Sequence, residues 1–318
     1  MTSRREFLTR GATAVAFAAT PFRGFAQKNS PFKVSVITDE ISDDFDRACS
    51  IAANDFGLGW VEIRGLWGTN IAEVKSDEIS RAQAVLAKYN LRVTDIASPL
   101  FKVDWPGAAR LQPSAKPADP ARAEAALRKQ ADVLAACIAV AKQFKTDKIR
   151  CFDFWRLADQ TPYRAAMDDK LREACDTANK QGIDLVIENE PACNTAMADE
   201  AARVLSAVPK LNLNWDPGNA ALDGEVDVFP VGFNMLPKDR IHHCHVKNVV
   251  SNAAGKREWA PVDKGYIDWA AQFRALKAAG YRQAVSLETH WRGAGTPEAS
   301  SRISWAGMKK ELQDSQTL

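Results

Sequence analysis

The sequence predicts a single α/β domain, a (β/α)8 TIM barrel over residues 32–313. From Phe32 onward, short runs rich in Val, Ile, Leu and aromatic residues alternate eight times with longer segments that carry apolar residues three and four positions apart. The chain has 318 residues, and a barrel of this kind needs roughly 250. A doubly wound open sheet is the alternative. It is disfavoured because neither G-x-G-x-x-G nor G-x-x-x-x-G-K-[ST] follows any predicted strand.

The predicted elements follow one another in a regular order. Strands are expected over residues 33–38, 60–64, 92–97, 148–154, 184–188, 211–215, 241–247 and 284–288. Helices are expected over residues 43–55, 76–89, 122–144, 163–181, 197–207, 269–279 and 297–312. The link between the sixth and seventh strands has no clear helical pattern. Asn90, Gly182 and Gly280 directly follow helices, and we expect them in the left-handed conformation that turns the chain into the next strand.

Residues 101–120 form an irregular excursion after the third strand. This segment contains Pro106, Pro113, Pro117 and Pro120, and proline interrupts both helices and strands. It follows the C-terminal end of a strand, which is the side where barrel enzymes keep their active sites. The segment is therefore a candidate lid.

The composition excludes several function classes. Lys and Arg number 42 and Asp and Glu number 40, and no stretch concentrates the basic residues, so nucleic acid is not expected as a partner. With four histidines in the chain, carboxylates must supply most ligands of any metal site. The six cysteines lack C-x-x-C spacing, and we expect buried thiols rather than a cysteine-ligated zinc or a disulfide framework.

Residues 1–26 resemble a twin-arginine export signal. Arg4 and Arg5 precede a weakly apolar run at residues 11–20, and a small-x-small site ends at Ala26. The apolar run is far shorter than the roughly 20 residues that a membrane-spanning helix needs. We therefore expect cleavage near Ala26, no stable membrane anchor, and a periplasmic protein that the twin-arginine translocase exports in folded form.

Polar side chains end four consecutive predicted strands. Glu188 closes the fifth strand, Asp216 follows the sixth, His245 lies in the seventh and Glu288 closes the eighth. The C-terminal strand ends of a barrel surround its mouth, so these side chains are expected to converge. Three carboxylates would repel one another there without a cation, and the set suits one divalent ion: manganese, cobalt, magnesium or zinc. The alternative is that some of them are strand-end caps or rim ion-pair partners.

Four motifs contain these residues: Ile187-Glu188-Asn189-Glu190-Pro191, Trp215-Asp216-Pro217-Gly218-Asn219-Ala220, His243-Cys244-His245-Val246-Lys247-Asn248 and Val285-Ser286-Leu287-Glu288-Thr289-His290. Together they resemble the xylose isomerase-like barrel superfamily, and more narrowly proteins labelled sugar phosphate isomerase/epimerase. The resemblance extends from about Phe32 to the C-terminal helix. It is most specific between Leu185 and Trp291.

The resemblance implies a single divalent ion held by Glu188, Asp216, His245 and Glu288, with an α-hydroxyketone or an aldose chelating the same ion. In the ketose 3-epimerase branch, two glutamates face opposite sides of the substrate. Glu188 and Glu288 would then be the catalytic residues, one removing a proton from carbon and the other returning one. The chemistry is sound, because a metal-bound carbonyl lowers the cost of the enediolate that proton abstraction creates.

Asn219 departs from the pattern of many relatives, which carry a histidine at this position after Asp-Pro-Gly. An amide can donate a hydrogen bond to a substrate but cannot shuttle a proton, so histidine chemistry is not expected there. The apurinic endonucleases of this superfold need many more histidines and a basic groove. True xylose isomerases use two metals and a larger carboxylate set. Neither identity is expected.

Further residues are candidates for substrate binding beside Asn219. Lys247 lies two residues after His245, which aims its ammonium into the mouth, either at a substrate hydroxyl or into an ion pair. Glu190 shares a face with the catalytic glutamate of its strand and either orients a ligand or forms a rim salt bridge. His290 follows the last predicted ligand and is expected to form part of the substrate wall.

Two more polar residues are expected inside the barrel. Glu62 lies in the second strand and is a further candidate for substrate binding. A carboxylate in that position needs a partner, and Arg64 and Arg150 are available. His243 is expected one layer below the mouth as a core histidine with its hydrogen bonds satisfied.

These observations favour a periplasmic, metal-dependent isomerase or epimerase that acts on an unphosphorylated sugar, keto-sugar or cyclitol. An elimination reaction is the first alternative, because inosose dehydratase-like relatives and lyases of 3-keto-glycosides would use the same metal and acid–base pair. A non-catalytic carbohydrate-binding protein is the second. Barrels of this family often dimerise, so a homodimer is compatible with the resemblance, although no apolar surface stripe stands out.

Overall fold

The computed structural model describes residues 30–112 and 119–318, so the predicted export signal at residues 1–26 lies outside the described residues. All eight predicted strands are present and form one parallel sheet, which confirms the predicted barrel. Their bounds are β1 Lys33–Val36, β2 Trp60–Ile63, β5 Arg92–Leu100, β6 Lys148–Cys151, β7 Asp184–Glu188, β8 Asn212–Trp215, β9 Ile241–Val246 and β12 Ala284–Leu287.

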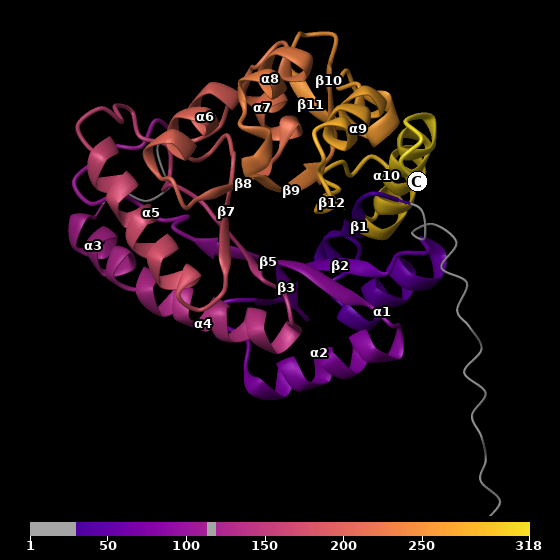
Figure 1. Ribbon diagram of the computed structural model, residues 1–318, viewed down its shortest axis with the longest axis horizontal. Helices are drawn as coiled ribbons and strands as arrows, with labels where there is room; N and C mark the ends of the chain where they lie inside the picture. The colour runs from indigo at the N-terminus through magenta and orange to yellow at the C-terminus, as the bar shows by residue number, and fades with distance from the viewer. Residues whose placement is uncertain (1–29, 113–118) are drawn as a thin grey trace, which may run out of the picture.

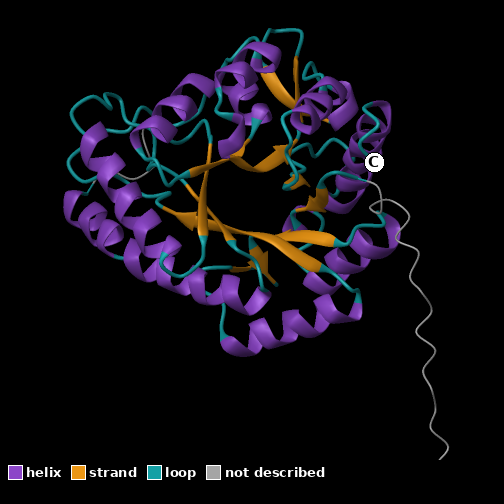
Figure 2. Cartoon of the chain, in the orientation of Figure 1, coloured by secondary structure: helices purple, strands orange, loops and turns teal. Residues whose placement is uncertain are grey.

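The sheet curls into a nearly closed barrel with the strand order β1-β12-β9-β8-β7-β6-β5-β2. Figures 1 and 2 show these strands arranged around a common centre, with the helices outside. At the seam between β1 and β2, the described chain has one parallel bridge, between Ile37 and Glu62. Arg64 crosses the same seam from the end of β2 and pairs with Asp39 and Glu40. An ion-pair cluster thus supplements the ladder where the barrel closes.

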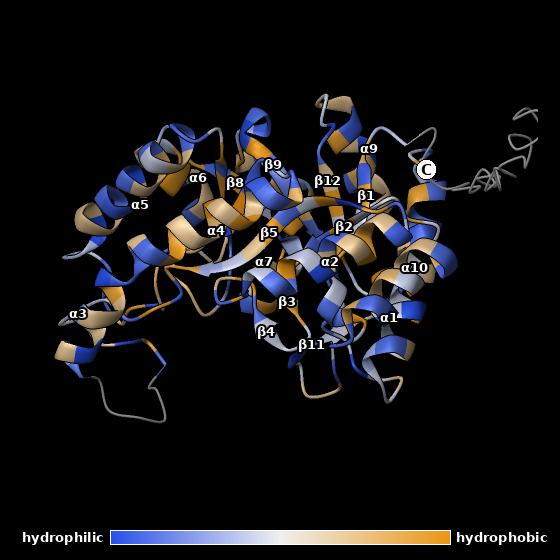
Figure 3. Cartoon of the chain, turned by 90° about the horizontal axis from the view of Figure 1, so that it is seen from below, coloured by the Kyte–Doolittle hydropathy of each residue, from blue (hydrophilic) through white to orange (hydrophobic). Residues whose placement is uncertain are grey.

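Helices cover the outside of the sheet. They are α1 Phe45–Ser50, α2 Ser76–Lys88, α3 Pro120–Arg128, α4 Gln130–Phe144, α5 Arg164–Asn179, α6 Ala198–Ala207, α9 Trp269–Ala278 and α10 Pro297–Asp314. Figure 3 shows hydrophilic and hydrophobic positions alternating along α5, as expected for a helix with one face on the sheet. Asn90, Gly182 and Gly280 have φ angles of 52°, 75° and 79°, which confirms the predicted left-handed turns.

Two predicted helices differ in detail. The helix expected over residues 122–144 is two helices that meet at Lys129, where ψ opens to −13°. The reason is packing, because α3 buries Ala123 alone whereas α4 buries seven side chains. The helix expected over residues 43–55 is α1 followed by a π-helical turn, Ile51–Asp55.

Shorter elements lie on the loops between strands. The link from β8 to β9, in which no clear helical pattern was predicted, contains the short helices α7 Pro217–Asp223 and α8 Phe233–Met235. After β9, the strands β10 Asn248–Ser251 and β11 Arg257–Ala260 form an antiparallel hairpin. A second small hairpin, β3 Gly65–Leu66 with β4 Thr69–Asn70, follows β2. Neither hairpin was predicted, because each is short and lies between the main strands and helices.

The described part of the candidate lid is attached to its neighbour. Backbone hydrogen bonds join Val103 to Trp155 and Leu111 to Arg156, at 3.0 and 2.8 Å. Residues 101–112 are therefore hydrogen-bonded through their backbone to the segment that follows β6. Residues 113–118 lie outside the described residues, and a lid function stays a prediction.

The core has an apolar outer layer and a polar centre. Between sheet and helices lie aliphatic and aromatic side chains. All six cysteines are free, buried thiols, as predicted. Within the barrel, Glu62 of β2 reaches His243 of β9. Because β1 and β12 lie between these two strands in the sheet, this contact crosses the lumen. The described helices include none that is long and apolar enough to span a membrane.

Candidate metal centre

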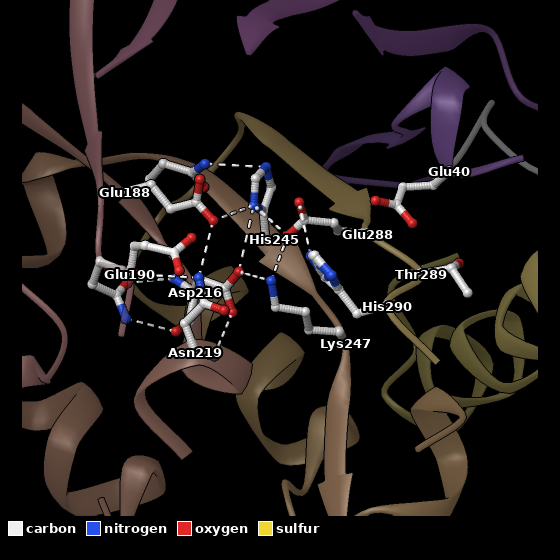
Figure 4. A network of polar contacts seen from close by, with 12 residues as sticks. Glu40, Glu188, Glu190, Asp216, Asn219, His245, Lys247, Glu288, Thr289 and His290 are labelled. Carbon is white, nitrogen blue, oxygen red and sulfur yellow. Dashed lines mark hydrogen bonds and ion pairs between the residues drawn. The ribbon is translucent and has the colours of Figure 1, made fainter. Parts of the chain in front are cut away.

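Four consecutive strands bring their polar ends to one point. Glu188 is the last residue of β7, Asp216 follows β8 as the N-cap of α7, His245 lies in β9 and Glu288 follows β12. One potential ligand atom of each lies within 4.8 Å of those of the other three. Figure 4 shows the four side chains converging. All four are buried, so the predicted convergence is present.

Glu188 is held on both of its oxygens. Its Oε2 accepts from Nη1 of Arg150 at 2.9 Å, and its Oε1 accepts from Nδ2 of Asn219 at 3.0 Å. Arg150 is itself fixed, because it donates to the carbonyls of Ala97 and Ser98 on β5. Burial alone would raise the pKa of Glu188, but the charges of Arg150 and His245 lower that pKa to about 2. Glu188 is therefore ionised at neutral pH.

Glu288 is surrounded by cationic and hydrogen-bonding side chains. Nη1 of Arg64 and Nε2 of His290 lie 3.3 and 3.2 Å from its Oε1, and the Lys247 ammonium contacts its Oε2. Burial would raise the pKa of Glu288, yet Lys247 and His245 hold the pKa well below its usual range. This second glutamate is also ionised at neutral pH.

Asp216 combines a structural and a ligand-like oxygen. Its Oδ1 accepts the backbone N–H of Asn219 at 2.9 Å and so caps α7. Its main chain exchanges two hydrogen bonds with the Asn189 side chain, which fixes the residue from both sides. Its Oδ2 is buried and lies 2.7 Å from the Lys247 ammonium, but the angle does not make a hydrogen bond. That oxygen therefore has an ion-pair partner but accepts no hydrogen bond from the described residues.

His245 presents its two ring nitrogens to different groups. Its Nδ1 lies 3.2 Å from Glu188, 3.4 Å from Asp216 and 3.2 Å from Glu288. Its Nε2 faces Glu62 at 3.0 Å. Burial lowers the pKa of His245, but the surrounding carboxylates, Glu62 first, raise that pKa well above its usual value. The site therefore attracts a positive charge.

Glu62 differs from its predicted environment. It is completely buried and accepts from His243 and His245, whereas the expected partners were Arg64 and Arg150. Arg64 instead faces the mouth, and Arg150 binds Glu188. The structure places Glu62 below the four predicted ligands rather than at the mouth. His243 is buried as predicted, although its Nδ1 has no hydrogen-bond partner.

The four side chains fit a divalent ion. Three carboxylates and one imidazole form a mixed oxygen and nitrogen set of the kind that binds Mn, Co, Mg or Zn. Each carboxylate is also held by a second group, and such support orients the ligands of natural metal sites. Oδ2 of Asp216 lies 3.4 Å from Nδ1 of His245, and in a neutral imidazole this nitrogen would offer a lone pair to an ion between them.

The predicted substrate-binding residues lie at different depths. Lys247 is buried and ion-paired to Asp216 and Glu288. The amide N–H groups of Asn219 donate to Glu188 and to the Asn189 carbonyl. Glu190 forms an ion pair with Lys102 at the rim, at 3.1 Å. His290 is half-buried and contacts Glu288, so it lies in the wall of the site.

The contacts of two residues near the site were not predicted from the sequence. Trp259 of β11 stacks on His290 with ring centroids 5.1 Å apart, and the Lys247 ammonium lies 5.0 Å from its ring. The short hairpin that carries it gave no strong signal. Arg150 was named as a partner for Glu62, and its position in β6 one residue before the strand ends could have indicated a contact with the neighbouring β7.

Comparisons with known proteins agree with this arrangement. A model of the xylose isomerase-like TIM barrel family matches residues 51–310. None of the curated proteins matches the chain. Among solved structures, the chain is similar to the probable 3-DHS dehydratase AsbF from Bacillus anthracis, at 21% identity and a TM-score of 0.62, over 87% of this chain and 97% of that one.

Two further structures share the fold. The D-allulose 3-epimerase from Methylomonas sp., solved in complex with D-allulose, is 16% identical with a TM-score of 0.63, over 91% of this chain and 98% of that one. The IOLI protein with a bound zinc atom is 14% identical with a TM-score of 0.64, over 90% and 99%. The family match spans most of the barrel and agrees with the motifs at the strand ends. The chain belongs to the xylose isomerase-like TIM barrel family.

Proposed function

We propose that this protein is an exported enzyme that uses one divalent metal ion to isomerise or epimerise an unphosphorylated sugar, keto-sugar or cyclitol. The observation that carries the proposal is the convergence of Glu188, Asp216, His245 and Glu288 from four consecutive strands. The D-allulose 3-epimerase among the similar structures is a precedent for sugar chemistry on this fold. The sequence lacks a glycine-rich anion cradle, which favours a substrate without phosphate.

The ion and the two glutamates would have separate tasks. A divalent ion supplies Lewis-acid polarisation of a carbonyl, which makes a proton on the adjacent carbon easier to remove. Glu188 and Glu288 are ionised at neutral pH because cations surround them, so both are in the basic form. We assign proton removal to one of them and proton return to the other, on opposite faces of the substrate carbon.

Three more side chains would assist the reaction. Burial lowers the pKa of Lys247, but the charges of Asp216 and Glu288 together raise this pKa by more. The ammonium of Lys247 therefore stays charged. That charge lies where it would stabilise negative charge developing on a substrate oxygen. Trp259 and His290 stack on one another beside this ammonium. They would form an aromatic wall against the flat apolar face of a sugar.

The test is proton exchange in deuterated water. Purified protein with Mn²⁺ is incubated with a panel of ketoses and inososes, and ¹H NMR follows the loss of each C–H signal. We expect exchange at a single carbon, reduced at least about 100-fold in Glu188→Gln and in Glu288→Gln. Asp184→Asn is the matched control, because Asp184 begins the same strand that Glu188 ends. This variant should catalyse exchange at the wild-type rate.

Other outcomes would contradict the assignment. Persistent exchange in either glutamine variant would remove the two-carboxylate mechanism. A dehydrated or cleaved product would make the enzyme a lyase or dehydratase. Sugar binding without exchange or product would indicate a carbohydrate-binding protein.

Export is a separate part of the proposal. It rests on Arg4, Arg5 and the apolar run before Ala26. We expect the wild-type protein in the periplasm, shortened at about Ala26, and the double variant Arg4→Lys, Arg5→Lys retained inside the cell at full length. Mass spectrometry of both cell fractions checks this, and export of the double variant at the wild-type level would contradict the twin-arginine route.

A further inference from the structure

Below the candidate metal centre, Glu62 bridges two histidines. Its Oε1 lies 3.0 Å from Nε2 of His245, and its Oε2 lies 2.9 Å from Nε2 of His243. The three side chains have no exposed surface. Since Glu62 comes from β2 and both histidines come from β9, the bridge connects opposite sides of the lumen. The bridge is made by side chains and is not part of the backbone hydrogen bonding of a helix or of the sheet.

This bridge gives each ring nitrogen of His245 one task. An ionised carboxylate can only accept hydrogen bonds, so Nε2 of His245 carries the hydrogen that points to Glu62. A neutral imidazole then has its lone pair on Nδ1. Nδ1 is the nitrogen that faces Glu188, Asp216 and Glu288. The lone pair therefore points to the position where the ligand oxygens converge.

The neighbouring amide fits this arrangement only with its oxygen and nitrogen exchanged. Nδ2 of Asn214 is placed 3.1 Å from the same Nε2 of His245, and Oδ1 of Asn214 has no partner. Two donors cannot share a hydrogen bond, and the oxygen and nitrogen of an amide are assigned from their contacts. Exchanging the two amide atoms turns the free Oδ1 toward Nε2 and gives its hydrogen a second acceptor.

A second ion in this layer is not needed to explain the bridge. Glu62, His243 and His245 also form a group that could hold a metal. Yet both carboxylate oxygens already lie at ordinary hydrogen-bond length from a ring nitrogen. Hydrogens between these atoms account for the contacts.

We propose that Glu62 is a positioning residue, which orients the ring of His245 and keeps the hydrogen on Nε2, so that Nδ1 is presented to the metal ion. His243 holds the second oxygen of Glu62 and thereby the direction of the carboxylate. The inference rests on the metal centre of the proposed function, but not on the reaction. Carboxylate support of a ligating histidine changes metal affinity by about 10–100-fold in natural sites.

The experiment measures zinc binding and the ring hydrogen directly. Zn²⁺ affinity is determined by competition with a chelator for the wild type, Glu62→Gln, Glu62→Met and Asp153→Asn. The proteins are labelled with ¹⁵N-histidine and loaded with zinc, and NMR follows the Nε2–H resonance of His245. The resonance can be assigned readily because the chain has four histidines. Asp153→Asn is the control, because Asp153 is an equally buried carboxylate held by Thr195.

Glutamine keeps one acceptor for His245, whereas methionine has the length of glutamate and no such acceptor. We expect zinc affinity within a few-fold of wild type for Glu62→Gln, about 10–100-fold weaker for Glu62→Met, and unchanged for Asp153→Asn. The Nε2–H resonance should move upfield in Glu62→Gln, because an amide is a weaker acceptor than a carboxylate. Should Glu62→Met not fold, this resonance decides the question.

The outcomes separate the two proposals. Wild-type affinity in Glu62→Met, or an unmoved resonance in Glu62→Gln, would overturn the positioning role and leave the metal centre standing. A wild-type protein that binds no zinc would overturn the metal centre, and this inference with it.

Discussion

Arg150→Met tests whether the buried ion pair with Glu188 holds the mouth of the barrel in place. Both side chains are almost fully buried, and their charged atoms are 2.9 Å apart. Removing Arg150 leaves the buried charge of Glu188 without its principal cation. We expect the free energy of unfolding to fall by about 3–5 kcal/mol.

The magnitude follows from opposing contributions. At an effective dielectric constant of about 20, two unit charges 2.9 Å apart attract each other by about 6 kcal/mol. The variant loses this attraction, and the carbonyls of Ala97 and Ser98 lose their donor, at about 1 kcal/mol each. Against this, the guanidinium no longer has to be dehydrated on folding, which recovers several kcal/mol. The net loss is therefore smaller than the sum of the contacts.

The assay is urea unfolding followed by tryptophan fluorescence, without added metal. Arg47→Met is the control, because Arg47 forms an exposed pair with Glu298 and should cost no more than about 1 kcal/mol. The double variant Arg150→Met, Glu188→Met should be more stable than Arg150→Met alone, since it no longer buries an unpaired charge. A loss below about 1 kcal/mol for Arg150→Met, or strictly additive effects in the double variant, would refute the reasoning.

Three further predictions concern packing, pH and metal. Gly218→Ala should cost about 1–3 kcal/mol of stability in urea unfolding, because a Cβ at Gly218 would lie 2.5 Å from Cγ of Lys247; an equal cost in a Lys247→Ala background would contradict this steric reason. Burial raises the pKa of Asp153 to about 7, so between its unfolded pKa and its folded pKa the native state holds a proton that the unfolded state has released, and stability falls as pH rises. Relative to Asp153→Asn, the wild type should lose about 2–3 kcal/mol in urea unfolding between about pH 5 and pH 7.5, and parallel pH profiles would contradict the raised pKa. Return of Mn²⁺ or Zn²⁺ to chelator-treated protein should raise the Tm of the wild type but not that of the Glu188→Ala, His245→Ala double variant; equal shifts would place the metal elsewhere.

The positions of the strand-end residues could be predicted from the sequence because their geometry is local. A strand that alternates inward and outward places its last residues at the mouth whatever lies across the barrel. Glu188 and Glu288 could therefore be located from strand boundaries alone. The helix expected over residues 122–144 failed at Lys129, because the apolar pattern does not record that α4 packs on the sheet while α3 buries a single residue.

The partners of the buried charges could not be derived in the same way. Glu62 was expected to pair with Arg64 or Arg150, the cations on its own and a nearby strand. Its actual partners are His243 and His245, which lie 181 and 183 residues away in the chain. Such pairings depend on the stagger between strands and on which side chains reach across the lumen, and neither is written in the periodicity of a single strand.

The sequence by itself determined the barrel and the four strand ends, because hydrophobic periodicity and strand order are carried by residues close together in the chain. The tertiary structure decided which carboxylate oxygen each Arg or Lys contacts and which nitrogen of His245 faces the predicted ligands. It also decided that the Lys247 ammonium lies over the ring of Trp259. These details arise where several strands meet in a buried, low-dielectric space. There, each polar group must find a partner among neighbours that the closure of the barrel brings together.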